Sequence, residues 1–191
     1  MAQFGWLLDL KRCVGCHACS VACKAENNTA PQQSPLTVRN GRAVAVNYRF
    51  VHNVDGGAYP HPTRTFVTMA CHHCEHPACL ASCPVGAITK LATADKRNGL
   101  VLIDQATCIG CRYCEWACPY GAPRFNEITG KVEKCTGCQH RLAKDLPPAC
   151  ATTCSGRALN WTDAFDFAGG YGTTPTGFAS VSLTHPAIRF L

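Results

Sequence analysis

The sequence predicts an α+β chain of short strands, short helices and long loops, arranged as two nested modules. Three observations support this prediction. Sixteen cysteines fall into four groups of four, most of them separated by only two to four residues. A short apolar segment precedes each group, and a short helical segment follows it. Aromatic residues make up only 8% of the chain, so an apolar core must be small.

The four cysteine groups share one short-range pattern. They are Cys13, Cys16, Cys19 and Cys23; Cys71, Cys74, Cys79 and Cys83; Cys108, Cys111, Cys114 and Cys118; and Cys135, Cys138, Cys150 and Cys154. The first and third groups read C-x2-C-x2-C-x3-C, the run with which bacterial ferredoxins ligate [4Fe–4S] clusters. The sequence therefore predicts four [4Fe–4S] clusters, two ferredoxin-like modules organised around them, and a function in electron transfer.

The predicted elements alternate with the cysteine groups. In chain order we expect strands over residues 4–10, 65–70 and 100–103, helices over 16–25 and 113–117, and a hairpin over 125–134 that turns at Gly130. Residues 27–62 are expected to form an irregular surface excursion. Residues 169–182 are either a loosely ordered end or an arm that wraps a partner.

These elements predict a nested domain organisation. The outer two-cluster module comprises residues 1–64 and 120–165, and the inner two-cluster module comprises residues 65–119. Residues 166–191 are expected to be an extended C-terminal tail.

The fourth cysteine of each group predicts an exchange of ligands within each module. It lies about one helical turn beyond the third, and in two-cluster ferredoxins this cysteine ligates the other cluster. We expect Cys13, Cys16, Cys19 and Cys154 at cluster 1; Cys135, Cys138, Cys150 and Cys23 at cluster 2; Cys71, Cys74, Cys79 and Cys118 at cluster 3; and Cys108, Cys111, Cys114 and Cys83 at cluster 4. In the fourth group, residues 141–148 are interpreted as an insertion.

The loop residues between the cysteines suit this chemistry. Thiolates are soft ligands for iron–sulfur clusters, and loop N–H groups can donate hydrogen bonds to cluster sulfur and raise the reduction potential. Gly15, Gly110 and Gly137 each precede a cysteine by one residue, where the backbone must come close to the cluster. Proline follows Cys83 and Cys118, as in ferredoxins.

Disulfides and structural zinc are weaker alternatives for the cysteines. A disulfide framework ties distant segments together, whereas these cysteines are crowded at two-residue gaps. A third cysteine at this spacing is unusual for a four-thiolate zinc site. We further expect the clusters to supply much of the folding free energy, because the apolar core is small.

The net charge of +6 does not indicate a nucleic-acid partner. It counts the cysteines as neutral; with sixteen thiolates and four oxidised cubane cores the charge becomes about −2. We interpret the surplus of lysine and arginine as compensation for buried anionic clusters. The sequence contains no basic block, no secretory signal and no apolar stretch of 18 residues, so a direct membrane span is not expected.

Motifs for catalysis by the chain itself are missing. The sequence has no dinucleotide-binding glycine loop, no phosphate-binding P-loop and no serine nucleophile elbow. We therefore expect a non-catalytic subunit of an oxidoreductase complex.

Three segments resemble the iron–sulfur subunit of the dimethyl sulfoxide reductase family. They are CIGCRYCEWACPYGAPRFNEITGKVEKCTGC at residues 108–138, DLKRCVGCHACSVACKAEN at residues 9–27 and CHHCEHPACLASCPVGA at residues 71–87. The resemblance implies two ferredoxin-like modules with four clusters. It also implies two partners, a large catalytic subunit with a bis-molybdopterin guanine dinucleotide cofactor and a quinone-reactive membrane anchor. The chain would be membrane-associated through these partners, on a cytoplasmic or periplasmic face.

The chain departs from that family at three points. Ser155 follows the last cysteine where proline is usual, which predicts a looser exit from the fourth loop. Cys111 stands where some relatives have tryptophan and a three-iron cluster, which favours four irons here. Some relatives have a C-terminal membrane helix, which is not expected from the sequence here. Two alternative functions are a free polyferredoxin and a subunit with its own active site.

Three further sets of residues each allow two interpretations. They are His72, His73 and His76; Arg112, Tyr113 and Trp116; and Lys134, Arg141 and Lys144. The histidines could ligate a cluster, but because each group already has four cysteines they are expected to be solvated or to support a cluster. The second set is expected to pack over a cluster or to dock a neighbouring protein. The third is expected to compensate cluster charge or to meet a partner's pterin-side surface.

Overall fold

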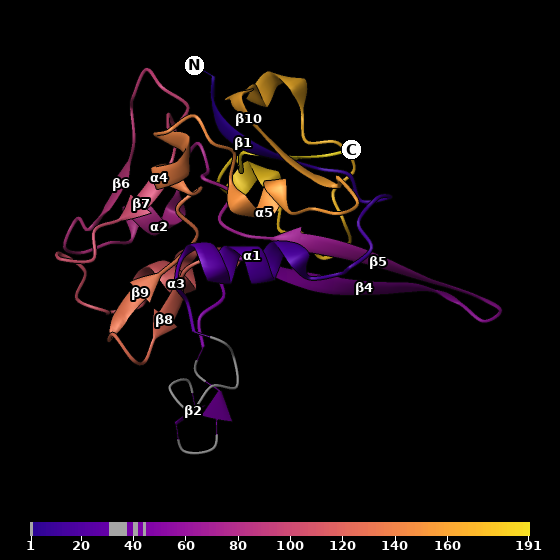
Figure 1. Cartoon of the computed structure of the whole chain (residues 1–191), viewed down its shortest axis with the longest axis horizontal. Coiled ribbons are helices and arrows are strands. Elements are labelled where there is room, and N and C mark those ends of the chain that lie inside the picture. The colour runs from indigo at the N-terminus through magenta and orange to yellow at the C-terminus, as the bar shows by residue number, and fades with distance from the viewer. Residues whose placement is uncertain (1, 31–37, 40–41, 44) are drawn as a thin grey trace.

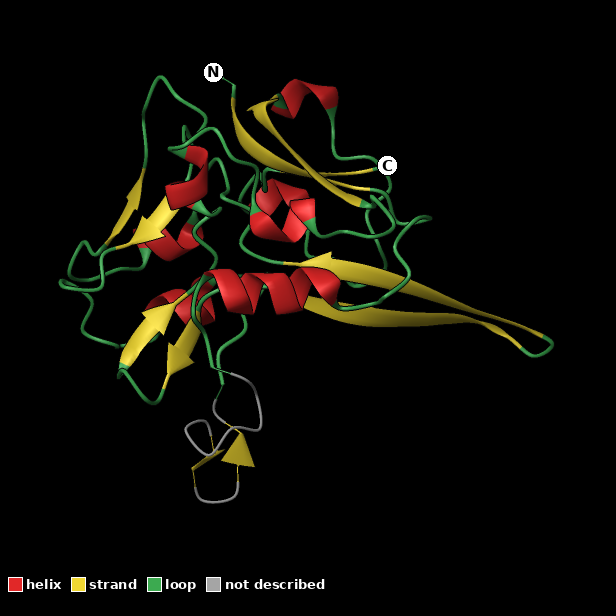
Figure 2. Cartoon of the chain, viewed as in Figure 1, coloured by secondary structure: helices red, strands yellow, loops and turns green. Residues whose placement is uncertain are grey.

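The fold consists of short helices and strands joined by long loops (Figures 1 and 2). The computed structural model describes residues 2–30, 38–39, 42–43 and 45–191. The strands are β1 Gln3–Leu8, β2 Val38–Arg39, β3 Arg42–Ala43, β4 Phe50–Ala58, β5 His61–Met69, β6 Ile88–Lys90, β7 Val101–Ile103, β8 Arg124–Asn126, β9 Lys131–Glu133, β10 Leu159–Phe165 and β11 Ile188–Phe190. The helices are α1 Ala18–Glu26, α2 Ala78–Ala81, α3 Tyr113–Ala117, α4 Gln139–Leu142 and α5 Ala149–Thr152, with 3₁₀ turns η2 Phe167–Gly169 and η3 Val181–Leu183.

Strand β1 is the centre of the largest sheet. It pairs antiparallel with β10 and parallel with β11, so both ends of the chain meet in one sheet. Phe4, Trp6 and Leu8 alternate along β1 and are all buried, as expected for one face of a strand that packs on the core. The strand expected over residues 4–10 is therefore observed. It begins one residue earlier, at Gln3, and ends two residues earlier, at Leu8.

The C-terminal segment differs from the expected extended tail. It folds back so that Ile188 and Phe190 are buried beside β1. The backbone N–H of Leu191 donates to the carbonyl oxygen of Leu8 at 2.9 Å. Burial of these apolar side chains holds the end of the segment against the sheet. The glycine-rich residues at the start of the segment gave no indication of this packing.

Strands β4 and β5 form a long hairpin that projects from the body of the molecule (Figure 1). Nine residues pair on each side, from Phe50 opposite Met69 to Ala58 opposite His61. The strand expected over residues 65–70 is the inner end of β5. The expectation of an irregular excursion over residues 27–62 is wrong for β4, and part of that range lies outside the described residues.

The other short elements follow the prediction more closely. Helix α3 has the expected bounds, β7 covers all but the first residue of the strand expected over residues 100–103, and β8 and β9 form the expected hairpin. Helix α1 lies against α5, and α2 lies against α3. The first and fourth cysteine groups thus come together, as do the second and third.

The apolar core includes many of the cysteines. Two clusters of buried apolar side chains are present among the described residues, and both include cysteine side chains from more than one group. The fold is therefore a small α+β arrangement in which cysteine side chains from different groups meet in the interior. In the part of the chain that the structure describes, no helix has the length and apolar character needed to cross a membrane.

Candidate iron–sulfur cluster sites

Three cavities are each lined by four cysteines. Site 1 contains Cys13, Cys16, Cys19 and Cys154; site 3 contains Cys71, Cys74, Cys79 and Cys118; site 4 contains Cys83, Cys108, Cys111 and Cys114. Each set combines three cysteines of one group with the last cysteine of another, the combination expected from the spacing. The three cavities are similar in size, so they suit occupants of one kind.

The remaining four cysteines form site 2. Cys23, Cys135, Cys138 and Cys150 are all buried. Burial raises the pKa of the Cys23 thiol to about 12, and the neighbouring Cys150 acts in the same direction. Burial also raises the pKa of Cys135, with added contributions from Cys23, Cys138 and Cys150. These mutual effects place the four side chains in one electrostatic environment.

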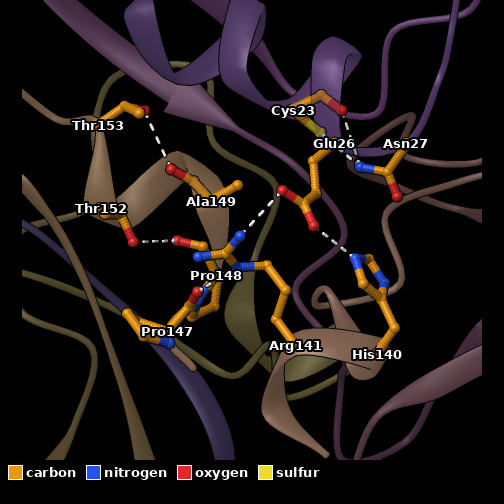
Figure 3. A network of polar contacts seen from close by, with 10 residues as sticks. All are labelled: Cys23, Glu26, Asn27, His140, Arg141, Pro147, Pro148, Ala149, Thr152 and Thr153. Atoms are coloured by element: carbon orange, nitrogen blue, oxygen red, sulfur yellow. Dashed lines mark hydrogen bonds and ion pairs between the residues drawn. The ribbon is translucent and has the colours of Figure 1, made fainter. Parts of the chain in front are cut away.

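A polar network fixes the helices around site 2 (Figure 3). Glu26 at the end of α1 accepts a hydrogen bond from Arg141 Nη1 at 3.0 Å and lies 2.7 Å from His140 Nε2. Arg141 also donates from Nε to the carbonyl oxygen of Pro147 at 2.8 Å. The hydrogen bond with His140 and the charge of Arg141 lower the pKa of Glu26. The insertion expected over residues 141–148 therefore helps to hold α1 against α4 and α5.

Backbone N–H groups point at cysteine sulfur in three sites. His73 donates to Cys71 Sγ at 3.5 Å in site 3. Gly137 donates to Cys135 Sγ at 3.4 Å in site 2, and Leu159 donates to Cys154 Sγ at 3.4 Å in site 1. Such hydrogen bonds stabilise negative charge on sulfur, which is the role predicted for the loop backbone.

Two hydroxyl groups also contact cysteine sulfur at site 1. Ser155 Oγ lies 3.6 Å from Cys16 Sγ, and Thr68 Oγ1 lies 3.3 Å from Cys19 Sγ. The N–H of Ala18 and then the Ser155 hydroxyl lower the pKa of Cys16. Ser155 thus occupies the usual proline position with a polar contact to a candidate ligand. Sequence spacing gave no signal for Thr68, which reaches site 1 from β5.

Lysine ammonium groups bind carbonyl oxygens of the cysteine loops. Lys90 donates to Cys74 O at 3.0 Å, Lys131 donates to Cys108 O, and Lys134 donates to Cys135 O at 3.1 Å and to Val101 O. Lys134 is buried. This arrangement places positive charge beside sites 3, 4 and 2 and supports the interpretation of the basic surplus as internal compensation.

The four sets of cysteine thiols fit the [4Fe–4S] clusters that the cysteine spacing predicts. Burial raises the pKa of Cys74 to about 12 and of Cys114 to about 11, so the crowded thiols would stay protonated without a cation among them. A bound metal core reverses this effect and holds its thiols deprotonated. None of the sixteen cysteines, all within the described residues, forms a disulfide. Four soft sulfur donors at each site match an iron–sulfur cluster.

The histidines near site 3 differ from one another. His72 and His73 are buried, which excludes the solvated alternative for these two and leaves the alternative that they support a cluster. His73 Nδ1 accepts a hydrogen bond from the Val101 N–H at 3.0 Å, and His72 packs edge-on against Tyr120. Burial, and then the charge of Arg49, lowers the pKa of His72 to about 3, so this side chain is neutral. The side chain of His76 is 70% exposed.

The structure also distinguishes exposed from buried residues in the two other sets that allowed two interpretations. Trp116 is 71% and Tyr113 is 53% exposed, which favours a docking surface over a buried shield. Arg112 lines the cavity of site 4 and pairs with Glu115 at 2.8 Å. Lys134 is internal, whereas Lys144 is exposed.

Comparisons with known proteins agree with this chemistry. Residues 63–164 match the family described as a 4Fe-4S dicluster domain. One chain of the anaerobic dimethyl sulfoxide reductase of Escherichia coli (strain K12) is 36% identical over 167 residues, covering 83% of this chain and 73% of the relative. One subunit of the sulfite dehydrogenase of Allochromatium vinosum is 37% identical, covering 87% and 71%. One subunit of the tetrathionate reductase of Salmonella typhimurium is 37% identical, covering 82% and 56%. The chain therefore belongs to the iron–sulfur subunits of the dimethyl sulfoxide reductase family of molybdoenzymes.

Proposed function

We propose that this chain is an electron-transfer subunit that holds four [4Fe–4S] clusters between a quinone-linked membrane anchor and a molybdopterin catalytic subunit. The observation that carries the proposal is the grouping of all sixteen cysteines into four sets of four. Bound clusters would supply reversible one-electron chemistry at each set. The chain itself supplies ligands, charge compensation and exclusion of water.

The ligand sets would be Cys13, Cys16, Cys19 and Cys154; Cys135, Cys138, Cys150 and Cys23; Cys71, Cys74, Cys79 and Cys118; and Cys108, Cys111, Cys114 and Cys83. The outer module would then be residues 1–64 and 120–165, and the inner module residues 65–119. Helix packing supports this nesting, because α1 lies against α5 and α2 against α3.

The placement of the ligands supports a linear order from site 1 to site 4. Helix α1 carries Cys19 for site 1 and Cys23 for site 2. Lys134 bonds the carbonyl oxygen of Cys135 at site 2, and its charge also acts on Cys79 at site 3. Sites 3 and 4 exchange ligands across the contact between α2 and α3.

Exposure of the ligands supports sites 1 and 4 as the two ends of this series. Cys16 is exposed at site 1, and Cys83 and Cys111 are partly exposed at site 4. All four cysteines of site 2 are buried, and site 3 has three buried cysteines. Electron transfer to another protein requires a cluster near the surface, so the partners would dock at sites 1 and 4.

Exposed apolar residues support docking at both ends. Val14 is 63% exposed beside site 1, and Ile109 is 61% exposed beside site 4, close in sequence to Trp116. The partners would be a large subunit with a bis-molybdopterin guanine dinucleotide cofactor and an integral membrane anchor. The chain would be membrane-associated through them. The alternative of a free polyferredoxin is less favoured, because the relatives are named as chains or subunits of reductases and dehydrogenases.

Affinity purification of the tagged chain from its native cells, under anaerobic conditions, tests the proposal. We expect a stable complex that contains molybdopterin and a membrane protein. A matched preparation in which the tag is placed on an unrelated protein gives the background. Recovery of the chain alone, with its clusters intact, would support the free polyferredoxin and contradict the subunit role.

A further inference from the structure

Arg49 is a buried cation with no acidic partner among the described residues. The residue is 2% exposed and lies immediately before β4. Its Nη1 donates to Thr68 Oγ1 at 3.2 Å, and its guanidinium carbon is 4.3 Å from the centroid of the Trp6 ring. Its Nε and Nη2 atoms are buried without a hydrogen-bond partner. Neither the cysteine spacing nor the family resemblance gave this residue a role.

Cysteines of two sites act on this guanidinium, one of them through Thr68. Thr68, its hydrogen-bond partner, lies 3.3 Å from Cys19 Sγ at site 1. Burial lowers the pKa of Arg49, but the thiols of Cys150 and Cys135 at site 2, followed by those of Cys19 and Cys23, raise it by more. The negative charge available to Arg49 within the described core therefore comes from the ligands of sites 1 and 2.

An unpaired buried charge is costly, and an arginine with two orphaned N–H groups is more costly still. A protein tolerates such a group when an opposite charge lies close by in the same low-dielectric environment. Thiolates of a bound cluster provide that charge. Arginine is suited to this place because it stays protonated and offers five donors in a fixed plane.

We propose that Arg49 is a tuning residue that raises the reduction potentials of the clusters at sites 1 and 2. The inference rests on the proposed cluster assignment. Each site gains one negative charge when it accepts an electron, and the fixed positive charge of Arg49 stabilises that state more than the oxidised one. Sites 3 and 4 should be affected less, because none of their ligands is among the four thiols that act most on the guanidinium.

Redox titration followed by electron paramagnetic resonance tests this proposal on the intact complex. Arg49→Met removes the charge and keeps much of the volume, and Arg49→Lys keeps the charge. We expect Arg49→Met to lower the midpoint potentials of two of the four clusters, those at sites 1 and 2. The equilibrium constant for reduction of each should fall at least tenfold, which corresponds to about 59 mV for one electron. Arg49→Lys should shift the same two by less. The control Arg64→Gln, at an exposed arginine paired with Asp55 on the hairpin, should shift none.

Iron content separates the possible failures. Wild-type protein without four clusters would overturn the proposed function itself. A fully loaded Arg49→Met protein with unchanged midpoints, or with four equal shifts, would overturn only the role of Arg49. If Arg49→Met loses iron, Arg49→Lys decides. If Arg49→Lys retains its iron, the site requires a positive charge, which supports the proposal. If both variants lose iron, the site requires the shape of the guanidinium group, which overturns the proposal.

Discussion

The indole N–H of Trp6 donates to the carbonyl oxygen of Cys71 at 3.0 Å. This hydrogen bond joins the central strand of the main sheet to the first cysteine of site 3. The same indole ring lies against Arg49, whose guanidinium lies in the electrostatic field of the thiols of sites 1 and 2. Trp6 is buried, so the contact is shielded from water. The first strand of the chain thus connects the two proposed modules directly.

Trp6→Phe should destabilise the folded protein. The substitution keeps an aromatic ring but removes the donor to Cys71, which leaves a buried carbonyl unsatisfied at a cost of about 1–2 kcal/mol. We expect the temperature at which the visible cluster absorbance is lost to fall by a few degrees, roughly 2–8 °C. The matched control is Trp116→Phe, because Trp116 is 71% exposed. Equal melting of the two variants would show that the Trp6–Cys71 bond contributes nothing.

The exchange of ligands predicts non-additive iron loss. Cys79 and Cys118 line the same cavity, so Cys79→Ala and Cys118→Ala should each abolish the same cluster. The double variant should lose about four irons per chain, as each single variant does. Iron analysis with spin quantitation checks this result.

Cys79→Ala combined with Cys83→Ala provides the control for that experiment. These cysteines are neighbours in one group but line the cavities of sites 3 and 4 respectively. This double variant should lose about eight irons per chain. The reverse result, with the larger loss from Cys79 and Cys118, would contradict the exchange.

Gly110→Ala should prevent normal loading of site 4. Gly110 has φ of +72°, and a Cβ atom at this position would collide with the backbone carbonyl oxygen of Gly130, which cannot move as a side chain can. Gly86→Ala is the control, because Gly86 has φ of +64° but open space around it. It should cost only the left-handed strain, about 1–2 kcal/mol. Iron content distinguishes the two, and full loading of Gly110→Ala would refute the predicted collision.

Glu26→Gln should weaken the contact between α1 and α4 at neutral pH. His140 and Arg141 lower the pKa of Glu26, so the charged carboxylate stabilises the fold above its ordinary pKa of about 4.3 and loses this effect as pH falls through the lowered value. We expect a destabilisation of about 1 kcal/mol at pH 7 that does not decrease at pH 5, where the carboxylate is still charged. Thermal loss of cluster absorbance at both values measures it. Equal melting of the wild-type and Glu26→Gln proteins at pH 7 would contradict a stabilising contact.

Much of the cysteine arrangement could be predicted from sequence, because ligand spacing is local. Cys118 follows Cys114 by about one helical turn and lies just past the end of a helix with the expected bounds, where the chain is extended, so the two side chains line different cavities. Which cluster each sulfur binds stays a prediction, although the structure groups the side chains in the same sets. The family and the electron-transfer role were likewise predictable, since both depend on these motifs.

Other features depend on contacts between distant residues and left no local pattern. Phe190 joins the core through pairing with β1, which lies at the opposite end of the sequence. The strand β4 contains two glycines and an aspartate, so its sequence reads as a loop until β5 pairs with it. Arg49 and Thr68 approach the sulfur atoms only through that same hairpin.

Iron and acid-labile sulfide per chain, measured on anaerobically purified complex, test the central claim most directly. Sixteen cysteines in four sets predict about sixteen irons and about sixteen sulfides per chain. A value near eight for each would mean that two of the four sets hold no cubane cluster, and would contradict the four-cluster account.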